Sequence, residues 1–396
     1  MNATVSSSTP PATTAADAVF MDRALELAAR GVALASPNPM VGAVLVREGK
    51  IIGEGFHAYE GILHAEIVAL ESAGGTARGA TLYINLEPCC HTGRTGPCTK
   101  GLIAAGVARV VAAMADPNPV VAGRGFQELR EAGIEVAAGL REAEARRLNE
   151  AFAWWIVSKK PLVTLKSALT LDGQLALPVP PGRARPKLKD RWISSEESRA
   201  EVQIMRHASD ALLTGIDTVL ADDPLLNDRT GLPRRRNLLR VVMDSRLRLP
   251  PRSKLVRSAD GDVLVFTRAK EDSPKAKALR RAGVEVVRLG GGRGARPDLC
   301  PAIEELGRRG VLSVLLEAGA TLNSAALSAG IVDKMRVFFA PKIAGFSVPA
   351  FAGKKSGAAR ASNAFRAAQD LRNVTMAQFG ADFAVEGYLR DVYRTR

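Results

Sequence analysis

Residue types that bind zinc and move protons gather in one stretch of this 396-residue chain. His64-Ala65-Glu66 is followed by Glu87-Pro88-Cys89-Cys90-His91 and then by Cys98. Zinc favours imidazole nitrogen and thiolate sulfur, and its catalytic sites use three protein ligands and keep the fourth position for water. One His and two Cys would supply the three ligands. Zinc held in this way lowers the pKa of the bound water and makes a hydroxide nucleophile available near neutral pH.

Glu66 is the candidate for the group that carries protons. Hydrolytic deamination needs a residue that moves protons from water to the leaving ammonia, and Glu66 lies two residues from His64. Residues two apart face nearly opposite sides of a regular helix, so we expect both at the open first turn of a helix over residues 63–72. Cys98 is expected to begin a second short helix, whose dipole would help to hold a thiolate.

The spacing leaves the ligand set open. Zinc nucleobase deaminases carry a His-x-Glu and a Pro-Cys-x-x-Cys segment, with two residues between the cysteines. Here eight residues separate Cys89 from Cys98, so Cys90 and His91 are alternative ligands. We interpret the isolated Cys300 and His207 as ordinary structural residues.

The order of predicted elements indicates an α/β protein of two domains. After a tail over residues 1–17, rich in Ser, Thr, Ala and Pro, the first domain is predicted to span 18–155. Its expected helices cover 20–31, 63–72, 99–105 and 142–156, and its expected strands cover 41–46, 50–53, 80–86 and 107–113. A Lys159-Lys160-Pro161 run then disfavours continuation of the last helix.

The second domain is predicted to span residues 156–396. Its expected strands cover 162–169, 211–214, 238–243, 263–266, 284–287, 312–316, 336–340 and 383–388. Its expected helices cover 196–207, 273–282, 301–309 and 322–329. The basic, Pro-rich run 178–191 reads as an exposed loop, and the glycine-rich run 290–294 as a surface turn without a Walker or Rossmann signature.

Composition narrows the class of protein. With 46% hydrophobic and 24% charged residues the chain is ordinary for a globular protein. It has no run of 18 uncharged apolar residues, and its first residues match neither a signal nor a transit peptide, so no membrane span is expected. Four cysteines, three of them within positions 89–98, indicate a reducing compartment, and we expect the cytoplasm.

The net charge of +14 is concentrated in the second half. Residues 1–150 hold 13 Lys+Arg against 16 Asp+Glu, and the remainder holds 42 against 25. This basicity suits phosphorylated small molecules, a phosphate-rich cofactor or nucleic acid. A base deaminase with an RNA-binding domain would need aromatic stacking positions among the basic residues, and the low aromatic content argues against it.

The pattern as a whole resembles the bifunctional deaminase–reductase family of riboflavin biosynthesis. In the first half the resemblance rests on residues 37–42, 64–66, 86–98 and 116–125, including the wide cysteine spacing. It implies a cytidine-deaminase-like domain of three αβα layers. It also implies one Zn²⁺ per chain on His64, Cys89 and Cys98, with Glu66 as the proton carrier. Asn38 and His57 would lie near the substrate.

In the second half the resemblance rests on residues 166–173, 192–194, 214–226, 244–245 and 317–319. It implies a dihydrofolate-reductase-like α/β domain that uses NADPH. The implied cofactor contacts are Ala168, Trp192, Thr218, Asp222, Ser245, Gly319, Ala320 and Thr321, and the implied substrate contacts are Arg206, Leu226, Arg229 and Glu317.

Simple physical reasons support these assignments. Small residues where a strand meets a helix, as at 317–321, let a pyrophosphate approach backbone N–H groups. Arginine suits bidentate capture of phosphate, so Arg206 and Arg229 are expected to hold the ribose 5-phosphate. Lys166 is expected to polarise the sugar oxygen as hydride arrives. Asp190 departs from the polar residue usual two positions before Trp192, which leaves one substrate contact without its usual residue.

The resemblance implies two successive reactions. The first is zinc-dependent hydrolytic deamination of 2,5-diamino-6-(5-phosphoribosylamino)pyrimidin-4-one. The second is NADPH-dependent reduction of the ribosyl group of 5-amino-6-(5-phosphoribosylamino)uracil to the ribityl form. The expected partners are these small molecules, with neither nucleic acid nor membrane, and the expected assembly is a homodimer or homotetramer.

Overall fold

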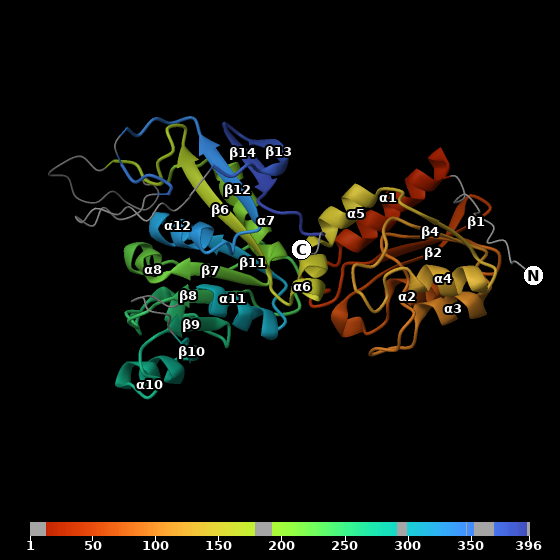
Figure 1. The fold of residues 1–396 in the computed structure, drawn as a ribbon, viewed down its shortest axis with the longest axis horizontal. Coiled ribbons are helices and arrows are strands. Elements are labelled where there is room, and N and C mark those ends of the chain that lie inside the picture. Colours follow the sequence, from red (N-terminus) through yellow and green to blue (C-terminus); the bar gives the residue numbers. More distant parts are fainter. Residues whose placement is uncertain (1–12, 179–191, 291–298, 346, 352–367, 394–396) are drawn as a thin grey trace, which may run out of the picture. The chain divides into compact units, whose positions relative to one another are not determined.

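The computed structural model describes residues 13–178, 192–290, 299–345, 347–351 and 368–393. The chain divides into two compact units, coloured red to yellow and green to blue in Figure 1. One unit ends at Ser158 and takes in Pro233–Arg235, and the other begins at Lys159. Most of the basic run 178–191 and of the glycine-rich run 290–294 lies outside the described residues.

The first unit is built on a sheet in the order β2-β1-β3-β4-β5. Its strands are β1 (Gly42–Arg47), β2 (Lys50–Phe56), β3 (Thr81–Ile84), β4 (Arg109–Ala112) and β5 (Glu135–Ala138). β1 runs antiparallel to β2 and β3, whereas β3, β4 and β5 are parallel. Parallel strands need crossover connections, which the helices of this unit supply.

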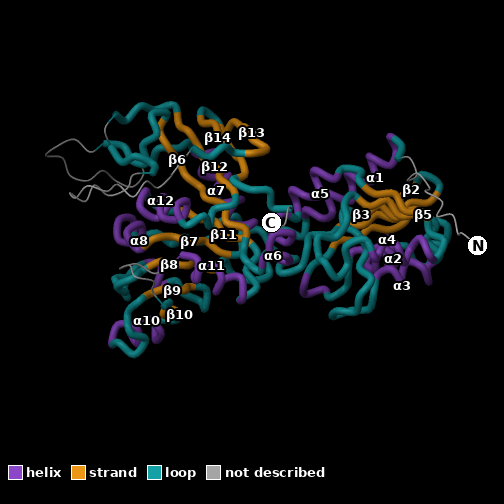
Figure 2. The backbone as a smooth tube through the Cα atoms, in the orientation of Figure 1, coloured by secondary structure: helices purple, strands orange, loops and turns teal. Residues whose placement is uncertain are grey.

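Helices cover both faces of this sheet, as Figure 2 shows. α1 (Ala15–Ala29) lies on one face, and α2 (Ala65–Ser72), α3 (Cys98–Ala105) and α4 (Arg124–Glu131) lie on the other. The predicted three-layer αβα arrangement is therefore confirmed. The central strand residues Val44, Leu82 and Val110 are fully buried between the layers.

Two predicted helices of this unit differ from the structure for a reason that their contacts show. α1 begins at Ala15, inside the predicted tail, because Thr14 and Asp17 form a reciprocal capping box that starts the helix earlier. The single helix predicted over 142–156 is two helices, α5 (Glu142–Leu148) and α6 (Glu150–Ser158). Asn149 lies at the break, where its amide accepts from Met40 N and donates to Met40 O.

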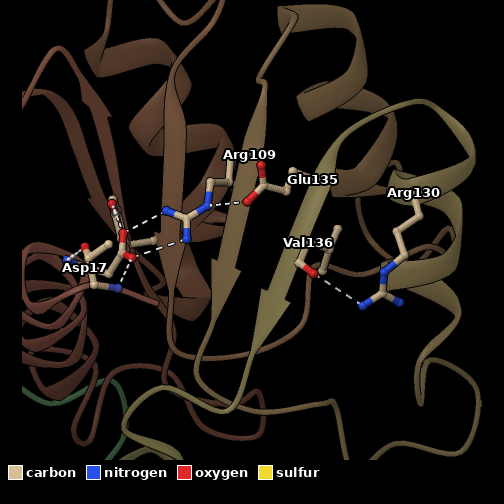
Figure 3. Close-up of polar contacts among 7 residues, drawn as sticks. Asp17, Arg109, Arg130, Glu135 and Val136 are labelled. Atoms are coloured by element: carbon tan, nitrogen blue, oxygen red, sulfur yellow. Dashed lines mark hydrogen bonds and ion pairs between the residues drawn. The ribbon is translucent and has the colours of Figure 1, made fainter. Parts of the chain in front are cut away.

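A buried ion pair ties α1 to the sheet (Figure 3). The Arg109 guanidinium on β4 donates to both carboxylate oxygens of Asp17, at 2.8 and 3.2 Å, and to Glu135 on β5 at 2.9 Å. Tyr83 on β3 donates to Asp17 at 2.6 Å. Burial by itself would raise the pKa of Asp17, but the hydrogen bonds from Arg109 and Tyr83 outweigh it and lower that pKa well below its usual range.

The second unit contains, within its described part, a nine-stranded sheet in the order β10-β9-β8-β7-β11-β6-β12-β14-β13. The strands are β6 (Leu162–Thr170), β7 (Ala211–Gly215), β8 (Leu239–Met243), β9 (Val263–Thr267), β10 (Val284–Arg288), β11 (Ser313–Glu317), β12 (Lys334–Ala340), β13 (Arg372–Phe379) and β14 (Asp382–Tyr388). The strands from β10 to β12 are parallel, and β14 and β13 follow antiparallel.

The parallel strands of this sheet are buried on both faces by helices, as is usual for parallel strands. On β7, Ala211 and Leu213 join one apolar core and Leu212 joins the other. The helices of this unit are α7 (Glu196–Ala208), α8 (Ile216–Asp222), α9 (Lys254–Arg257), α10 (Pro274–Arg281), α11 (Leu299–Arg308) and α12 (Ala320–Ser328). No helix in the described part of the chain has the length and apolar character to cross a bilayer.

Candidate active sites

The first turn of α2 carries two of the predicted residues of the zinc site. His64 immediately precedes the helix in an extended conformation, and Glu66 is its second residue and is 3% exposed. Glu66 lies near enough to His64, Cys89 and Cys98 for these side chains to shift its pKa, and Cys98 is the first residue of α3. The irregular geometry of a helix start thus lets both side chains face the same site, as we predicted.

His64, Cys89 and Cys98 form a group whose ligand atoms all lie within 4.8 Å of one another. His64 Nδ1 lies 3.2 Å from Cys98 Sγ and 3.4 Å from Cys89 Sγ. Tetrahedral zinc with bonds of about 2.0–2.3 Å places neighbouring donor atoms roughly 3.5–3.8 Å apart, so these side chains fit the ion with little movement. Among the described residues the group does not include Cys90 or His91.

The electrostatics of this group favour one thiolate, on Cys89. Hydrogen bonds from Cys98 and His64 outweigh burial and lower the pKa of the Cys89 thiol, whereas the contact with Cys89 and burial raise the pKa of the Cys98 thiol. Burial, reinforced by the nearby Cys89 thiolate, raises the pKa of Glu66 to about 7. A buried carboxyl group that exchanges its proton near neutrality suits a residue that must both accept and donate a proton.

A close contact between backbones fixes the position of α2. A Cβ atom at Gly55 of β2 would lie 2.4 Å from the carbonyl oxygen of Ala65 and 2.7 Å from the backbone nitrogen of Ala69. Only a residue without a side chain permits this approach. The first turn of α2, with His64 and Glu66, therefore rests directly on the sheet.

Asn38 and His57 lie together beside the zinc group. His57 Nδ1 is 2.8 Å from Leu63 O, and His57 Nε2 is 3.0 Å from Asn38 Nδ2. The His57 ring also meets the His64 ring edge to face, with centroids 5.4 Å apart. The structure thus brings both residues that we expected near the substrate to the side of His64, a predicted zinc ligand.

Glu87, two residues before Cys89, holds a loop beneath the site. Its buried carboxylate accepts hydrogen bonds from the backbone N–H groups of Asp116, Gly123 and Phe126 at 3.0, 2.9 and 3.2 Å. A Cβ atom at Gly125 would lie 2.1 Å from Pro88 O, so loop and ligand segment are in direct contact. Sequence reasoning assigned no role to Glu87, although its place next to Pro88-Cys89 was a usable signal.

The second unit contains a cavity of about 1370 Å³ at the carboxyl ends of its parallel strands. Gly215, Met243 and Glu317, the last residues of β7, β8 and β11, all line it. Ligands of open α/β sheets bind at this edge. The cavity is also lined by every residue predicted for the reductase site: Lys166, Ala168, Trp192, Arg206, Thr218, Asp222, Leu226, Arg229, Ser245, Glu317, Gly319, Ala320 and Thr321.

A cluster of charged side chains lies in this cavity. Arg206 Nε and Nη2 donate to the two carboxylate oxygens of Glu317 at 2.7 and 3.0 Å, and Lys166 Nζ lies 4.0 Å from Glu317. Burial lowers the pKa of Lys166, which eases proton donation. The opposing charges of Arg206 and Lys166 outweigh burial and keep the pKa of Glu317 below its usual range.

The cavity also has the features that a dinucleotide phosphate needs. β11 ends at Glu317 and α12 begins at Ala320, with Gly319 as the residue before the helix, as we predicted. The N–H groups of this turn are available to an anion. Sequence reasoning missed four further basic side chains that line the cavity, namely Arg199, Arg246, Arg248 and Lys254. Arg246 and Arg248 directly follow Ser245, which was a usable signal.

Two family models match the chain. The zinc-binding region of cytidine and deoxycytidylate deaminases matches residues 14–114, and the RibD C-terminal domain matches residues 161–384, more than half of the chain. The chain belongs to the RibD family. It is therefore a bifunctional enzyme of riboflavin biosynthesis with a zinc-binding deaminase domain followed by a reductase domain.

Relatives and solved structures of the RibD family match this chain over most of its length. The riboflavin biosynthesis protein RibD of Escherichia coli is 43% identical over 83% of this chain and 89% of its own length, and that of Actinobacillus pleuropneumoniae is 42% identical over 84% and 85%. Acinetobacter baumannii RibD superimposes with a TM-score of 0.77 at 37% identity, covering 94% of this chain and 98% of its own.

A Thermotoga maritima protein also superimposes with a TM-score of 0.77, at 34% identity over 94% of this chain and 98% of its own. It is described as a diaminohydroxyphosphoribosylaminopyrimidine deaminase and 5-amino-6-(5-phosphoribosylamino)uracil reductase. The α/β fold class and the order of a deaminase and a reductase domain, which we expected from the sequence, are thus confirmed.

The hydrogen bonds of Arg206 bear on its predicted role as a phosphate ligand. Its guanidinium is engaged by Glu317 and by Asn227 O, the latter at 3.1 Å from Nη1. Arg229 approaches the same cavity from a neighbouring loop. Capture of a phosphate by Arg206 and Arg229 remains a prediction, and the geometry favours Arg229 for it.

Proposed function

We propose that the first site deaminates 2,5-diamino-6-(5-phosphoribosylamino)pyrimidin-4-one. The observation that carries this proposal is the group of His64, Cys89 and Cys98 with the buried carboxyl of Glu66 beside it. A zinc ion held by these three ligands would supply the Lewis acidity that activates water. Glu66 takes a proton from the attacking water and delivers it to the amine, which leaves as ammonia.

Asn38 and His57 hold the pyrimidine in this proposal. The His57 ring is neutral, with its proton on Nδ1 directed to Leu63 O. Its other nitrogen, Nε2, therefore accepts a hydrogen bond from the Asn38 amide. A fixed tautomer orients the Asn38 amide, and a fixed amide can distinguish a ring carbonyl from a ring amine. The pair therefore orients the base so that its amine-bearing carbon faces Glu66.

The second site reduces the ribosyl group of 5-amino-6-(5-phosphoribosylamino)uracil to the ribityl form in our proposal. The support is a cavity large enough for a dinucleotide and a sugar phosphate together, with a helix start and several basic residues in its wall. NADPH, when bound there, supplies the hydride. Lys166 donates a proton to the sugar oxygen as the ring opens, and Glu317 holds Lys166 and Arg206 in place.

Trp192 and the turn at 319–321 form the proposed cofactor wall together with Ala168, Thr218, Asp222 and Ser245. Arg229 holds the ribose 5-phosphate, and Leu226 packs against the sugar.

We further propose a homodimer or homotetramer, supported by the exposed apolar residues Val374 and Met376 on the edge strand β13. All four cysteines are free thiols, which is in keeping with the cytoplasm.

The test is a coupled assay with purified protein and the diaminopyrimidine substrate. We expect ammonia release followed by oxidation of NADPH that depends on the deaminated product. Glu66→Ala is expected to abolish ammonia release and to leave reduction of supplied aminouracil intact, because the two sites use different residues. Loss of both activities in this variant, or deamination of RNA without oxidation of NADPH, would contradict the proposal.

A further inference from the structure

The loop between α8 and β8 carries two residues of the proposed substrate site. Leu226 and Arg229 both line the cavity. Leu226 adopts a left-handed backbone conformation, with φ of 58°, which is unfavourable for a non-glycine residue. Such a conformation persists only where surrounding contacts hold it. The question is which contacts hold this loop.

Three side chains from the last two turns of α7 grip the loop. Gln203 Oε1 accepts from Arg229 N at 3.1 Å, and Arg206 Nη1 donates to Asn227 O at 3.1 Å. His207 Nδ1 lies 2.8 Å from Asp228 Oδ2. Residues at this spacing lie on one face of a helix, so α7 presents a single gripping surface to consecutive residues of the loop.

The contact between His207 and Asp228 is the buried one among these contacts between α7 and the loop. Their side chains are 6% and 8% exposed, and neither residue lines the cavity. The second oxygen of Asp228 accepts from Thr230 N at 2.9 Å and from Thr230 Oγ1 at 2.8 Å. Asp228 therefore fixes the backbone on both sides of Arg229.

We propose that His207 and Asp228 are positioning residues of the reductase site, which hold Leu226 and Arg229 in place for the phosphorylated substrate from behind the cavity wall. Because Arg206 also binds Glu317, the same helix sets the position of the substrate loop relative to the charged cluster. This inference rests on the proposed reductase site and assigns a role to a histidine that the sequence presents as an ordinary structural residue.

The first experiment measures steady-state oxidation of NADPH with the aminouracil substrate in His207→Ala and Asp228→Ala. Loss of a charge-assisted hydrogen bond is expected to raise KM for the aminouracil about tenfold, with KM for NADPH within about twofold and kcat within about threefold. The double variant is expected to match the single variants, because the two residues act as one unit. His207→Asn keeps a donor near the position of Nδ1 and is expected to restore KM.

Asp333→Ala is the matched control. Asp333 is a buried carboxylate that binds Val163 N and Arg390. It lies at the amino ends of β6 and β12, away from the cavity at the carboxyl ends of the parallel strands. Its loss is expected to lower the Tm without changing KM for the aminouracil. An unchanged aminouracil KM in His207→Ala, an equal rise of both KM values, or additive effects in the double variant would overturn the proposal.

A second experiment reads the loop without turnover. Hydrogen–deuterium exchange of the substrate-free protein is expected to show faster exchange at the Arg229 and Thr230 amides in His207→Ala and Asp228→Ala than in the wild type or in Asp333→Ala. Unchanged exchange there would overturn the proposal. Failure of the wild-type enzyme to oxidise NADPH would instead count against the proposed function, and the exchange result would still decide the role of the pair.

Discussion

The Asn38 amide donates a hydrogen bond to Nε2 of His57. The contact made by Nδ1, the other nitrogen of the ring, decides which of the two groups is the donor. Leu63 O can only accept, and it lies 2.8 Å from His57 Nδ1, so Nδ1 carries the proton. His57 Nε2 is then an acceptor for the Asn38 amide 3.0 Å away. Burial lowers the pKa of His57, which keeps the ring neutral and the direction of this hydrogen bond fixed.

This relationship predicts coupled effects on the deaminase. Asn38→Ala and His57→Ala are each expected to raise KM for the diaminopyrimidine about tenfold, and the double variant is expected to lose no more than either alone. Ammonia release measures the effect. Oxidation of NADPH on supplied aminouracil serves as the internal control and should not change. Fully additive losses would show that the two side chains act separately.

The zinc content of cysteine variants tests whether Cys89 and Cys98, rather than the adjacent Cys90, bind the metal. Cys89→Ser and Cys98→Ser are expected to bind less than about a tenth of the zinc of the wild type, because each removes a thiolate from a three-ligand site. Cys90→Ser is the matched control and is expected to keep one zinc per chain, since Cys90 lies outside the group. Metal analysis of dialysed protein gives the result. Zinc loss in Cys90→Ser would require another ligand set.

Gly55→Ala tests how closely α2 must approach the sheet. A methyl group there would lie 2.4 Å from Ala65 O and must displace the first turn of the helix. We expect a loss of about 1–3 kcal/mol of unfolding free energy and at least about a hundredfold loss of deaminase kcat/KM, because His64 and Glu66 would move with the helix. Gly61→Ala, where a Cβ meets nothing within 4 Å, should behave as wild type.

Alanine substitutions of Arg229 and Arg206 are expected to change the kinetic parameters of the reductase in different ways. Arg229→Ala should raise KM for the aminouracil by about tenfold or more with little change in kcat, because it removes a phosphate contact. Arg206→Ala should lower kcat as well, since it leaves the buried Glu317 without its bidentate partner. Initial-rate kinetics with both substrates varied separate these results. Identical kinetic profiles would place both arginines in one role.

The ion pair of Asp17 with Arg109 predicts a dependence of stability on pH. The pKa of Asp17 is lowered in the folded state, so its contribution is present above the ordinary carboxyl pKa of about 4 and is lost as the pH falls below it. Asp17→Asn is expected to lower the free energy of unfolding by about 2–3 kcal/mol at pH 7, somewhat less than for a fully buried pair because Arg109 is partly exposed. Urea unfolding at several pH values should show this difference shrink in acid.

Much of both sites could be predicted because their residues stand next to strong local signals. His64, Glu66, Cys89 and Cys98 occur in a pattern whose chemistry admits few uses. The helix predicted from residue 63 begins at Ala65, and Cys98 begins the next helix as predicted. In the second unit, apolar runs bounded by turns gave most of the strands correctly. The motif residues at their carboxyl ends then had to meet at one edge of the sheet.

What sequence reasoning missed depends on contacts between distant segments. The short β5 and the exposed β13 have weak apolar patterns, and neither was predicted. Asn149 lies at the end of a helix, where Met40, 109 positions away, supplies its hydrogen-bond partners. The pairing of Arg206 with Glu317 joins residues 111 positions apart, and nothing in either local sequence shows it.

The three backbone hydrogen bonds that Glu87 accepts give the segment over residues 116–126, a loop and the first residues of α4, an unusual property. Surface connections normally tolerate changes in length. This connection is held by a single side chain two positions from Cys89, a proposed zinc ligand, so an insertion or deletion in it is expected to displace Cys89. Transplanting the zinc segment into another α/β scaffold would therefore require the loop to travel with it.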